Sequence, residues 1–301
     1  WTALKRRAAE LGVRVMGDMP IYVNHASADV WANPVLFKLD GRMRPAAVAG
    51  GPPDYFSSTG QLWGNPVYDW ERARETGYEW WLRRVEHNLA LFDAVRIDHF
   101  RGLVAYWEVP AGEKTALNGR WVEAPAGDFF GRLRERLGAP ALVAEDLGII
   151  TDDVREIMER FGFPGMKVLL FAFGPDFAAH PYNPANYTRN CVAYTGTHDN
   201  NTARGWFEGE ATAEEKQSLF QFLGREVGAE EVPCELIRKL MMSTADTVIF
   251  PMQDVLALGA EARMNTPSTV EGNWRWRLPP GLPAAEMISR IREMTTVWGR
   301  A

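Results

Sequence analysis

The stretch Ala94–Gly102, AVRIDHFRG, decides how the rest of the sequence is interpreted. Its first half is apolar, and the chain then turns abruptly polar at Asp98, His99 and Arg101. A buried parallel strand shows this pattern where it ends at a polar site. We therefore predict a strand that ends just before Asp98 and a functional site that begins there.

Arg96 lies two residues before Asp98. Because side chains alternate between the two faces of a strand, Arg96 and Asp98 should lie on the same face. A guanidinium beside a carboxylate favours the ionised form of the acid. An isolated pair of this kind is most simply an ordinary ion pair at a solvated strand end. Whether this pair belongs to a catalytic site therefore has to be judged from the rest of the chain.

Other strand-like stretches also end in polar residues. They cover Val13–Met16, Ala141–Ala144, Val168–Phe173, Cys191–Tyr194 and Thr247–Phe250. Helical patterns separate them, and alternating strands and helices predict a parallel sheet. Polar residues at the carboxyl ends of successive strands are typical of a (β/α)8 barrel enzyme. A doubly wound sheet is the competing fold, but it usually carries a glycine-rich phosphate turn after an early strand, and the sequence has no such motif in that context.

The fold class that we predict is therefore α/β, a (β/α)8 TIM-type barrel with long loop insertions. Six strands are visible where a closed barrel has eight, so we expect the first two to precede Trp1 and the barrel to be incomplete. Residues 1–301 form one partial catalytic barrel in this interpretation. The segment 22–69 is rich in Pro, Gly and aromatic residues and lacks clear periodicity, so we expect a loop subdomain over the cleft.

Composition argues against several classes of partner. The net charge is −6 and the Lys and Arg residues are scattered, which argues against nucleic acid as a ligand. No apolar run is long enough to span a membrane. Cys191 and Cys234 are too few for a disulfide framework or a zinc site, which fits a reducing, cytoplasmic location.

Four predicted strand ends carry carboxylates, at Asp18, Asp98, Glu145 and Asp199. A retaining glycosidase needs one ionised carboxylate as nucleophile and one carboxylic acid that protonates the leaving oxygen. Arg96 should keep Asp98 ionised, whereas burial and the neighbouring Asp98 charge should raise the pKa of Glu145. Asp199 and the neighbouring His198 would then bind sugar hydroxyls.

Two other interpretations remain open on the residues alone. A metal-dependent barrel hydrolase is one, because Asp98, His99, Glu145, Asp146, His198 and Asp199 are all possible ligands. The sequence has no HxH or HExxH pair, which weakens that hypothesis. A non-catalytic glucan-binding module is the other. Loss of activity on chelation would favour the metal site, and binding without turnover would favour the module.

Six motifs in order resemble the 4-α-glucanotransferase family, the amylomaltases or disproportionating enzymes of the α-amylase clan. They are GDMPIYV, PPDYFSSTGQLWGNP, RIDHFRG, AEDLG, YTGTHDN and NTPSTVEGNWRWR. The resemblance covers about Leu11 to Arg277. It implies that the chain is the larger, C-terminal part of such a protein and that a preceding segment of the same protein completes the barrel.

The resemblance also implies roles for particular residues. Asp98 matches the nucleophile, Glu145 the general acid/base, and Asp199 the aspartate that stabilises the transition state. The implied substrate-binding residues are Asp18, Asp54, Phe56, Gln61, Trp63, Arg96, His99, His198, Asn273 and Trp274. Of these, Asp54, Phe56, Gln61 and Trp63 belong to a stretch, Gly50 to Asn65, that resembles the family's mobile loop over the cleft.

The implied reaction moves α-1,4-glucan segments between maltooligosaccharides, or to glucose, through a covalent glucosyl-enzyme. It requires no cofactor and no metal ion. An α-1,4-glucan hydrolase of the same clan is the alternative, since the two activities differ only in whether a sugar or water accepts the glucosyl group.

Overall fold

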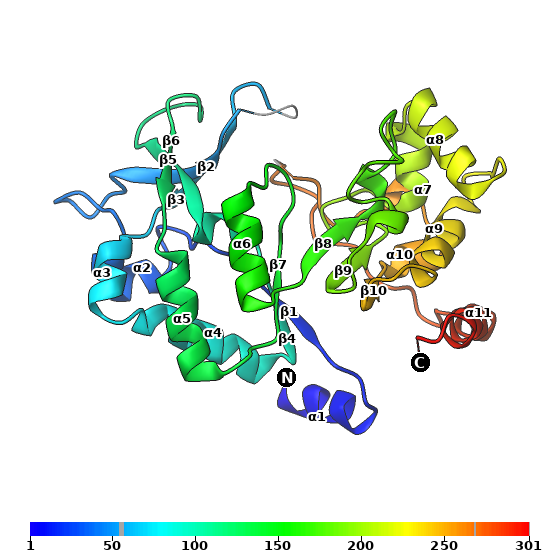
Figure 1. Ribbon diagram of the computed structural model, residues 1–301, viewed down its shortest axis with the longest axis horizontal. Helices are drawn as coiled ribbons and strands as arrows, with labels where there is room; N and C mark the ends of the chain where they lie inside the picture. Colours follow the sequence, from blue (N-terminus) through cyan, green and yellow to red (C-terminus); the bar gives the residue numbers. More distant parts are fainter. Residues whose placement is uncertain (54–56, 268, 301) are drawn as a thin grey trace. The chain divides into compact units, whose positions relative to one another are not determined.

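The computed structural model describes residues 1–53, 57–267 and 269–300 (Figure 1). The chain forms two compact units, Trp1–Gly165 and Met166–Ala301. Parallel strands followed by helices recur in both, as the alternating sequence pattern predicts.

The parallel sheet of the first unit has the order β1-β4-β7. Its strands are β1 (Met16–Met19), β4 (Ala94–Ile97) and β7 (Leu142–Ala144). The register places Asp18 opposite Arg96, so the polar residues of neighbouring strands meet at the carboxyl end of the sheet. The first strand begins at Met16, three residues later than predicted, and Val13 is exposed instead.

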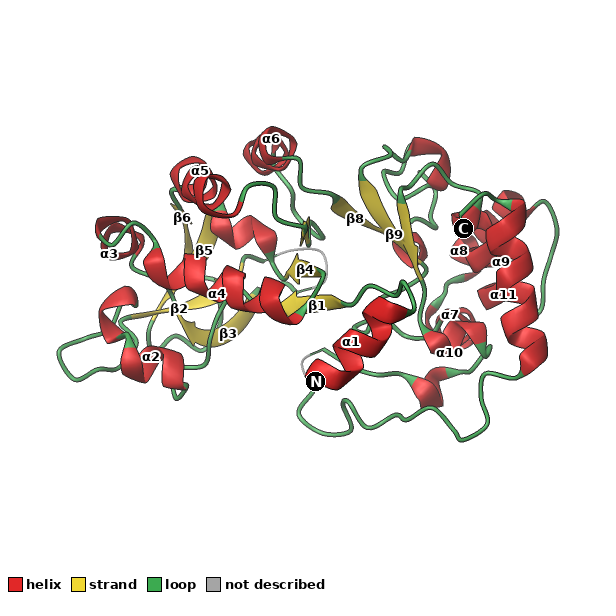
Figure 2. Cartoon of the chain, turned by 90° about the horizontal axis from the view of Figure 1, so that it is seen from below, coloured by secondary structure: helices red, strands yellow, loops and turns green. Residues whose placement is uncertain are grey.

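The first unit also contains helices. They are α1 (Thr2–Glu10), α2 (Ala28–Ala32), α3 (Trp70–Glu75), α4 (Glu79–Leu91), α5 (Ala126–Leu137) and α6 (Asp152–Phe161). Helix α4 packs against β1 and β4 and beside α5 (Figure 2). Helices α3 and α4 do not form one continuous helix, because Gly77 and Tyr78 between them adopt φ values of 65° and 62° that a helix cannot accommodate.

A four-stranded antiparallel sheet, of order β3-β2-β5-β6, includes part of the segment 22–69, which we expect from the sequence to form a loop subdomain over the cleft. It is formed by β2 (Ala47–Gly51), β3 (Gln61–Pro66), β5 (Ala105–Pro110) and β6 (Arg120–Glu123). Strand β2 contains glycines, which are uncommon in strands and therefore make it difficult to predict. Gly50 allows the close approach of β3, since a Cβ at this position would lie 2.4 Å from the carbonyl oxygen of Gln61.

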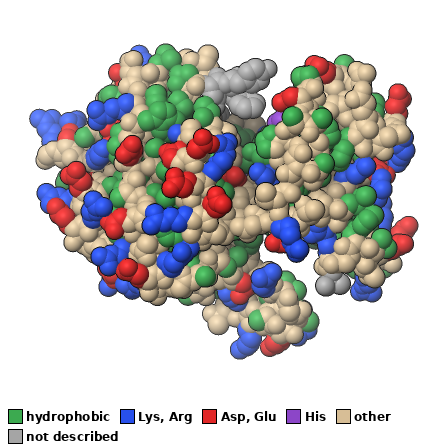
Figure 3. All heavy atoms as spheres, viewed as in Figure 1, with side chains coloured by type: hydrophobic (Ala, Val, Ile, Leu, Met, Phe, Trp, Pro, Cys, Tyr) green, Lys and Arg blue, Asp and Glu red, His purple; other side chains and the backbone are tan. Residues whose placement is uncertain are grey.

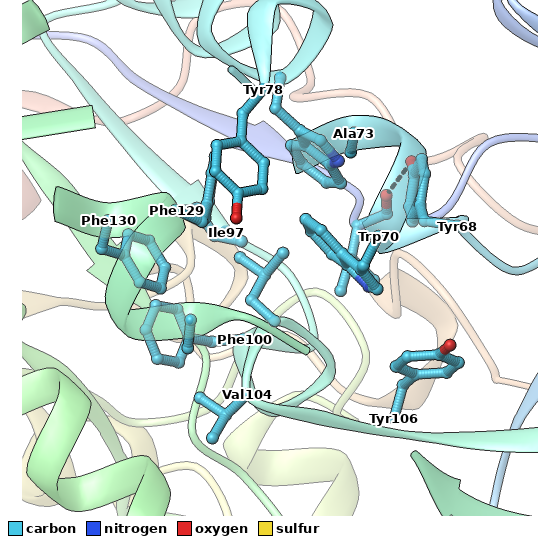
Figure 4. Packing of buried hydrophobic residues seen from close by; sticks show 14 of the residues in the cluster. Tyr68, Trp70, Ala73, Tyr78, Ile97, Phe100, Val104, Tyr106, Phe129 and Phe130 are labelled. Atoms are coloured by element: carbon cyan, nitrogen blue, oxygen red, sulfur yellow. Dashed lines mark hydrogen bonds between the residues drawn. The ribbon is translucent and has the colours of Figure 1, made fainter. Parts of the chain in front are cut away.

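The core of the first unit is strongly aromatic (Figure 4). The rings of Trp70 and Trp81 stack with centroids 5.6 Å apart, and Phe100 stacks on Phe130 at 5.3 Å. Tyr68 is buried as well and donates its hydroxyl proton to the carbonyl of Ile21. Many of the aromatic residues therefore stabilise the layer between sheet and helices rather than a ligand site.

The second parallel sheet has the order β10-β9-β8, with β8 (Gly165–Val168), β9 (Cys191–Tyr194) and β10 (Thr247–Ile249). Its helices are α7 (Ala203–Gly205), α8 (Ala213–Leu223), α9 (Val232–Met241), α10 (Met252–Val255) and α11 (Ala285–Val297). The strand predicted at Val168–Phe173 ends at Val168, because the next residues form a 3-10 turn.

The shorter helical turns of both units are η1 (Pro34–Leu36), η2 (Phe100–Leu103), η3 (Leu169–Phe171), η4 (Pro184–Asn186), η5 (Trp206–Glu210, a π-helix) and η6 (Ala260–Ala262).

Basic and acidic side chains are interspersed on the face that Figure 3 shows, and neither sign forms a continuous field there. Within the described residues, every helix is too short or too polar to cross a bilayer.

Candidate active site

A buried guanidinium organises the carboxyl end of the first parallel sheet. The Arg96 side chain is 9% exposed, and its Nη1 lies 2.7 and 2.6 Å from the two carboxylate oxygens of Asp18. Its Nη2 donates to Oδ1 of Asp98 at 2.7 Å. The prediction that Arg96 and Asp98 share a face is confirmed. These hydrogen bonds are charge-assisted and orient both carboxylates, which remain open to solvent.

Glu145 follows β7 directly and lies beside the turn that follows Asp98. Its backbone N–H donates to Ile97 at 3.0 Å, and its carbonyl accepts from Phe100 at 3.1 Å, so the strand pairing continues past the end of β7. Its carboxylate accepts the N–H of His99 on Oε2 at 2.8 Å and the N–H of Leu147 on Oε1 at 3.0 Å. Both oxygens are therefore held in place by backbone donors.

The environment raises the pKa of Glu145 from 4.5 to about 7. Burial is the largest cause and the negative charge of Asp98 is the second, while Arg96 and the two backbone donors act in the opposite direction. These are the two causes that the sequence predicts. The Glu145 carboxyl can therefore both give and take a proton at neutral pH. The neighbouring carboxylate, that of Asp98, is bound to the guanidinium of Arg96.

His99 follows Asp98 in the chain and is partly buried. Its φ of 48° turns the backbone from β4 into η2, and burial, with the charge of Arg101 second, lowers the pKa of its imidazole to about 4. The imidazole is therefore neutral at pH 7, and it forms a T-shaped pair with the indole ring of Trp63, with centroids 4.7 Å apart. Its Nε2 is buried and has no hydrogen-bond partner among the described residues.

Two predicted substrate-binding residues lie on β3. The indole N–H of Trp63 donates to Oε1 of Gln61 at 3.1 Å, and both side chains remain exposed. Because β3 pairs with β2, they are carried by an antiparallel hairpin and not by an irregular loop. Asp54 and Phe56 lie outside the described residues, so their part in this surface stays a prediction.

The second unit presents His198 and Asp199 in the turn after β9. Nε2 of His198 lies 3.4 Å from Oδ2 of Asp199. Two residues that the sequence analysis missed hold the aspartate: Nδ2 of Asn265 lies 2.6 Å from Oδ1, and Nη2 of Arg263 donates to the backbone carbonyl at 2.8 Å. No local pattern could have revealed them, because they lie more than sixty residues further along the chain.

The side chains of Asn273 and Trp274, both predicted to bind substrate, make different contacts. The Trp274 ring lies 5.1 Å from that of His198, which places an exposed indole beside this turn. The Asn273 side chain instead accepts from the N–H of Thr266 and donates to the carbonyl of Thr269. Asn273 thus stabilises its own loop, and a contact with substrate remains a prediction, as does the meeting of Asp199 with Asp98.

In the ranges that the structure describes, no three His, Cys, Asp or Glu side chains gather where they could hold one ion.

The fold is that of solved amylomaltases. Amylomaltase from Streptococcus agalactiae in complex with acarbose is 40% identical and superimposes with a TM-score of 0.95, covering 99% of this chain and 60% of that one. The structure of amylomaltase from Corynebacterium glutamicum, 21% identical, gives a TM-score of 0.82 over 97% of this chain and 48% of that one. The predicted fold class, α/β with the strands and helices of a (β/α)8 barrel, is confirmed by this likeness.

Sequence comparison agrees. A 4-alpha-glucanotransferase from Aquifex aeolicus is 50% identical over 300 residues, 100% of this chain and 61% of the relative, and one from Thermus thermophilus is 51% identical over 98% of this chain and 60% of the relative. The chain thus spans about 60% of the length of these relatives. The family model for 4-alpha-glucanotransferase matches residues 1–283. The chain belongs to the 4-alpha-glucanotransferase family.

Proposed function

We propose that the protein containing this chain transfers α-1,4-glucan segments between maltooligosaccharides, or to glucose, by a retaining double displacement. Family membership supports the reaction class. The observation that carries the mechanism is the contrast between two neighbouring carboxyl groups. Arg96 binds the Asp98 carboxylate, while the pKa of Glu145 is raised to about 7.

In the first displacement, an oxygen of Asp98 attacks the anomeric carbon of the glucan. The bond from that carbon to the glycosidic oxygen breaks, and Glu145 gives its proton to the departing oxygen. The segment on the non-reducing side becomes an ester of Asp98, and the other segment leaves with a new 4-hydroxyl. Arg96 holds the attacking carboxylate in one orientation throughout.

In the second displacement, Glu145 acts as a base. It takes the proton of the 4-hydroxyl of an acceptor sugar as that oxygen bonds to the anomeric carbon and the ester to Asp98 breaks. A pKa of about 7 suits both directions, because the carboxyl is neither fully protonated nor fully ionised at neutral pH. Two inversions give overall retention.

Asp199 and His198 are proposed to bind the hydroxyls of the sugar at the cleaved bond and to favour its distorted, oxocarbenium-like form. Trp63 and Trp274 are exposed indoles that can stack on the flat faces of glucose rings. Acarbose, which is bound in the S. agalactiae amylomaltase, is a suitable probe of sugar binding by each of these residues. We also propose a cytoplasmic location, which the two free cysteines support.

Incubation of the full-length protein with maltotriose tests the proposal. Transfer produces glucose and a ladder of longer oligosaccharides while the total of reducing ends stays constant. Hydrolysis, the alternative, makes reducing ends increase with time. Absence of both products from the wild-type protein would refute the proposed function, and Glu145→Gln provides the inactive control.

A further inference from the structure

The turn that carries His198 and Asp199 is buried at both ends and exposed at its tip. It runs from Thr195, directly after β9, to Thr202, directly before α7. Thr195 and Ala203 are 0% exposed, whereas the Asp199 side chain is 42% exposed. The position of the tip therefore depends on how the two ends are held.

One carboxylate binds both ends. Asp254 lies in α10, the short helix that follows β10, and β10 is the neighbour of β9 in the parallel sheet. Its Oδ2 accepts the hydroxyl proton of Thr195 at 2.6 Å, and its Oδ1 accepts the N–H of Ala203 at 2.8 Å. Asp254 is itself 1% exposed, so these contacts are shielded from water.

Helix capping accounts for only part of this arrangement. The side chain of Thr202 already caps α7 by accepting the N–H of Gly205 at 2.9 Å. The contact of Asp254 with Thr195 lies at the opposite end of the turn, where no helix begins. Both donors to Asp254 are neutral groups, and burial raises the pKa of its carboxyl. Among the described residues this carboxyl has no cationic partner. Burial of such an acid is costly for stability, which indicates a geometric role.

We propose that Asp254 is a positioning residue, whose carboxylate joins the two ends of the Thr195–Ala203 turn and thereby fixes the location of Asp199 and His198. Arg263 and Asn265 hold the tip of the same turn directly, so the turn is fixed at its base by one residue and at its tip by two. The proposal rests on the proposed function only in so far as Asp199 acts on the transition state.

The experiment removes the Thr195 contact from the full-length protein and measures maltotriose transfer. In Thr195→Val the hydroxyl is replaced by a methyl group of similar size. We expect kcat to fall by about 10- to 100-fold with little change in KM, because displacement of a group that acts mainly in the transition state lowers kcat. Thr195→Ser restores the hydroxyl and should recover most of the activity.

Two further variants separate positioning from stability. Val255→Ala creates a cavity in the same helix, α10, without touching the turn, so it should lower the melting temperature and leave kcat unchanged. Asp254→Asn should lower kcat at least as much as Thr195→Val does. The double variant should cost no more than Asp254→Asn alone, since Thr195 acts on the turn through its contact with Asp254. A kcat for Thr195→Val that equals that of Val255→Ala would overturn the proposal.

Amide hydrogen exchange gives a readout that does not depend on transfer. Peptides covering residues 195–206 should exchange faster in Thr195→Val than in wild type, and Val255→Ala should leave them unchanged. Unaltered exchange in Thr195→Val would refute the positioning role. If wild-type protein transfers no glucan, the proposed function fails, and the exchange measurement alone decides whether Asp254 holds the turn.

Discussion

Replacement of Glu145 by glutamine should stabilise the protein at alkaline pH while abolishing its activity. The folded-state pKa of this carboxyl is about 7 and its ordinary value is 4.5, so the folded protein binds the proton more tightly than the unfolded chain does. Stability from this group is therefore fully present below pH 4.5 and is lost as the pH rises through about 7. Glutamine does not titrate and avoids that loss.

The magnitude follows from the same values. The difference between 4.5 and about 7, at about 1.4 kcal/mol for each pH unit, gives at most about 3 kcal/mol at pH 8. Against this, the amide of glutamine cannot accept the N–H of both His99 and Leu147, and one lost hydrogen bond costs about 1 kcal/mol. We expect a net stabilisation of about 1–2 kcal/mol at pH 8 and a net destabilisation of about 1 kcal/mol below pH 4.5.

Urea unfolding of wild type and Glu145→Gln, followed by tryptophan fluorescence between pH 4 and 8.5, measures this difference. The two stability curves should cross between pH 4.5 and about 7. Glu135→Gln, an exposed residue of α5, is the matched control and should show no crossing. A stability difference for Glu145→Gln that is the same at every pH would refute the raised pKa and, with it, the argument for a general acid.

Other predictions follow from the same geometry. Asp98→Asn should lower kcat by several orders of magnitude with the melting temperature nearly unchanged, because the side chain is half-exposed; a rate close to that of wild type would exclude Asp98 as nucleophile. The kcat/KM of the wild-type protein should fall about tenfold per pH unit above about 7, as Glu145 loses its proton, and a flat profile from pH 6 to 9 would contradict that role. Arg96→Lys should lower kcat at least about tenfold, since an ammonium cannot present the fixed fork that binds Asp18 and Asp98 together; full activity in this variant would show that any cation suffices. Dialysis against EDTA should leave the rate unchanged, and loss of activity that added metal restores would revive the metal-dependent alternative.

The parallel strands could be predicted from the sequence because each is a short apolar run that ends in charge. The alternation of side chains along β4 also predicted that Arg96 and Asp98 share a face, where they form an ion pair. The raised pKa of Glu145 could be anticipated from the buried strand before it and the acid beside it. These features depend on local patterns that the chain displays directly.

The antiparallel sheet of β2, β3, β5 and β6 could not be predicted in the same way. Strands β2 and β5 pair although helices α3 and α4 lie between them in the chain. The glycines and prolines in 47–66 are typical of loops, and only the close approach of β3 to Gly50 explains why a glycine is needed there. The contacts of Asp254, Arg263 and Asn265 with the turn after β9 were missed for a related reason. Each joins residues more than fifty positions apart, and neither periodicity nor composition records such a pairing.

The central claim is that Asp98 forms the bond to the sugar while Glu145 moves the proton. Glu145→Gln protein treated with α-maltosyl fluoride tests it most directly, because fluoride leaves without a general acid and the ester then lacks the base needed for its release. Mass spectrometry of the digested protein should show one maltosyl group on the peptide that contains Asp98, and none when Asp98→Asn is added. An unmodified peptide, or a maltosyl group on any other carboxylate, would contradict the mechanism.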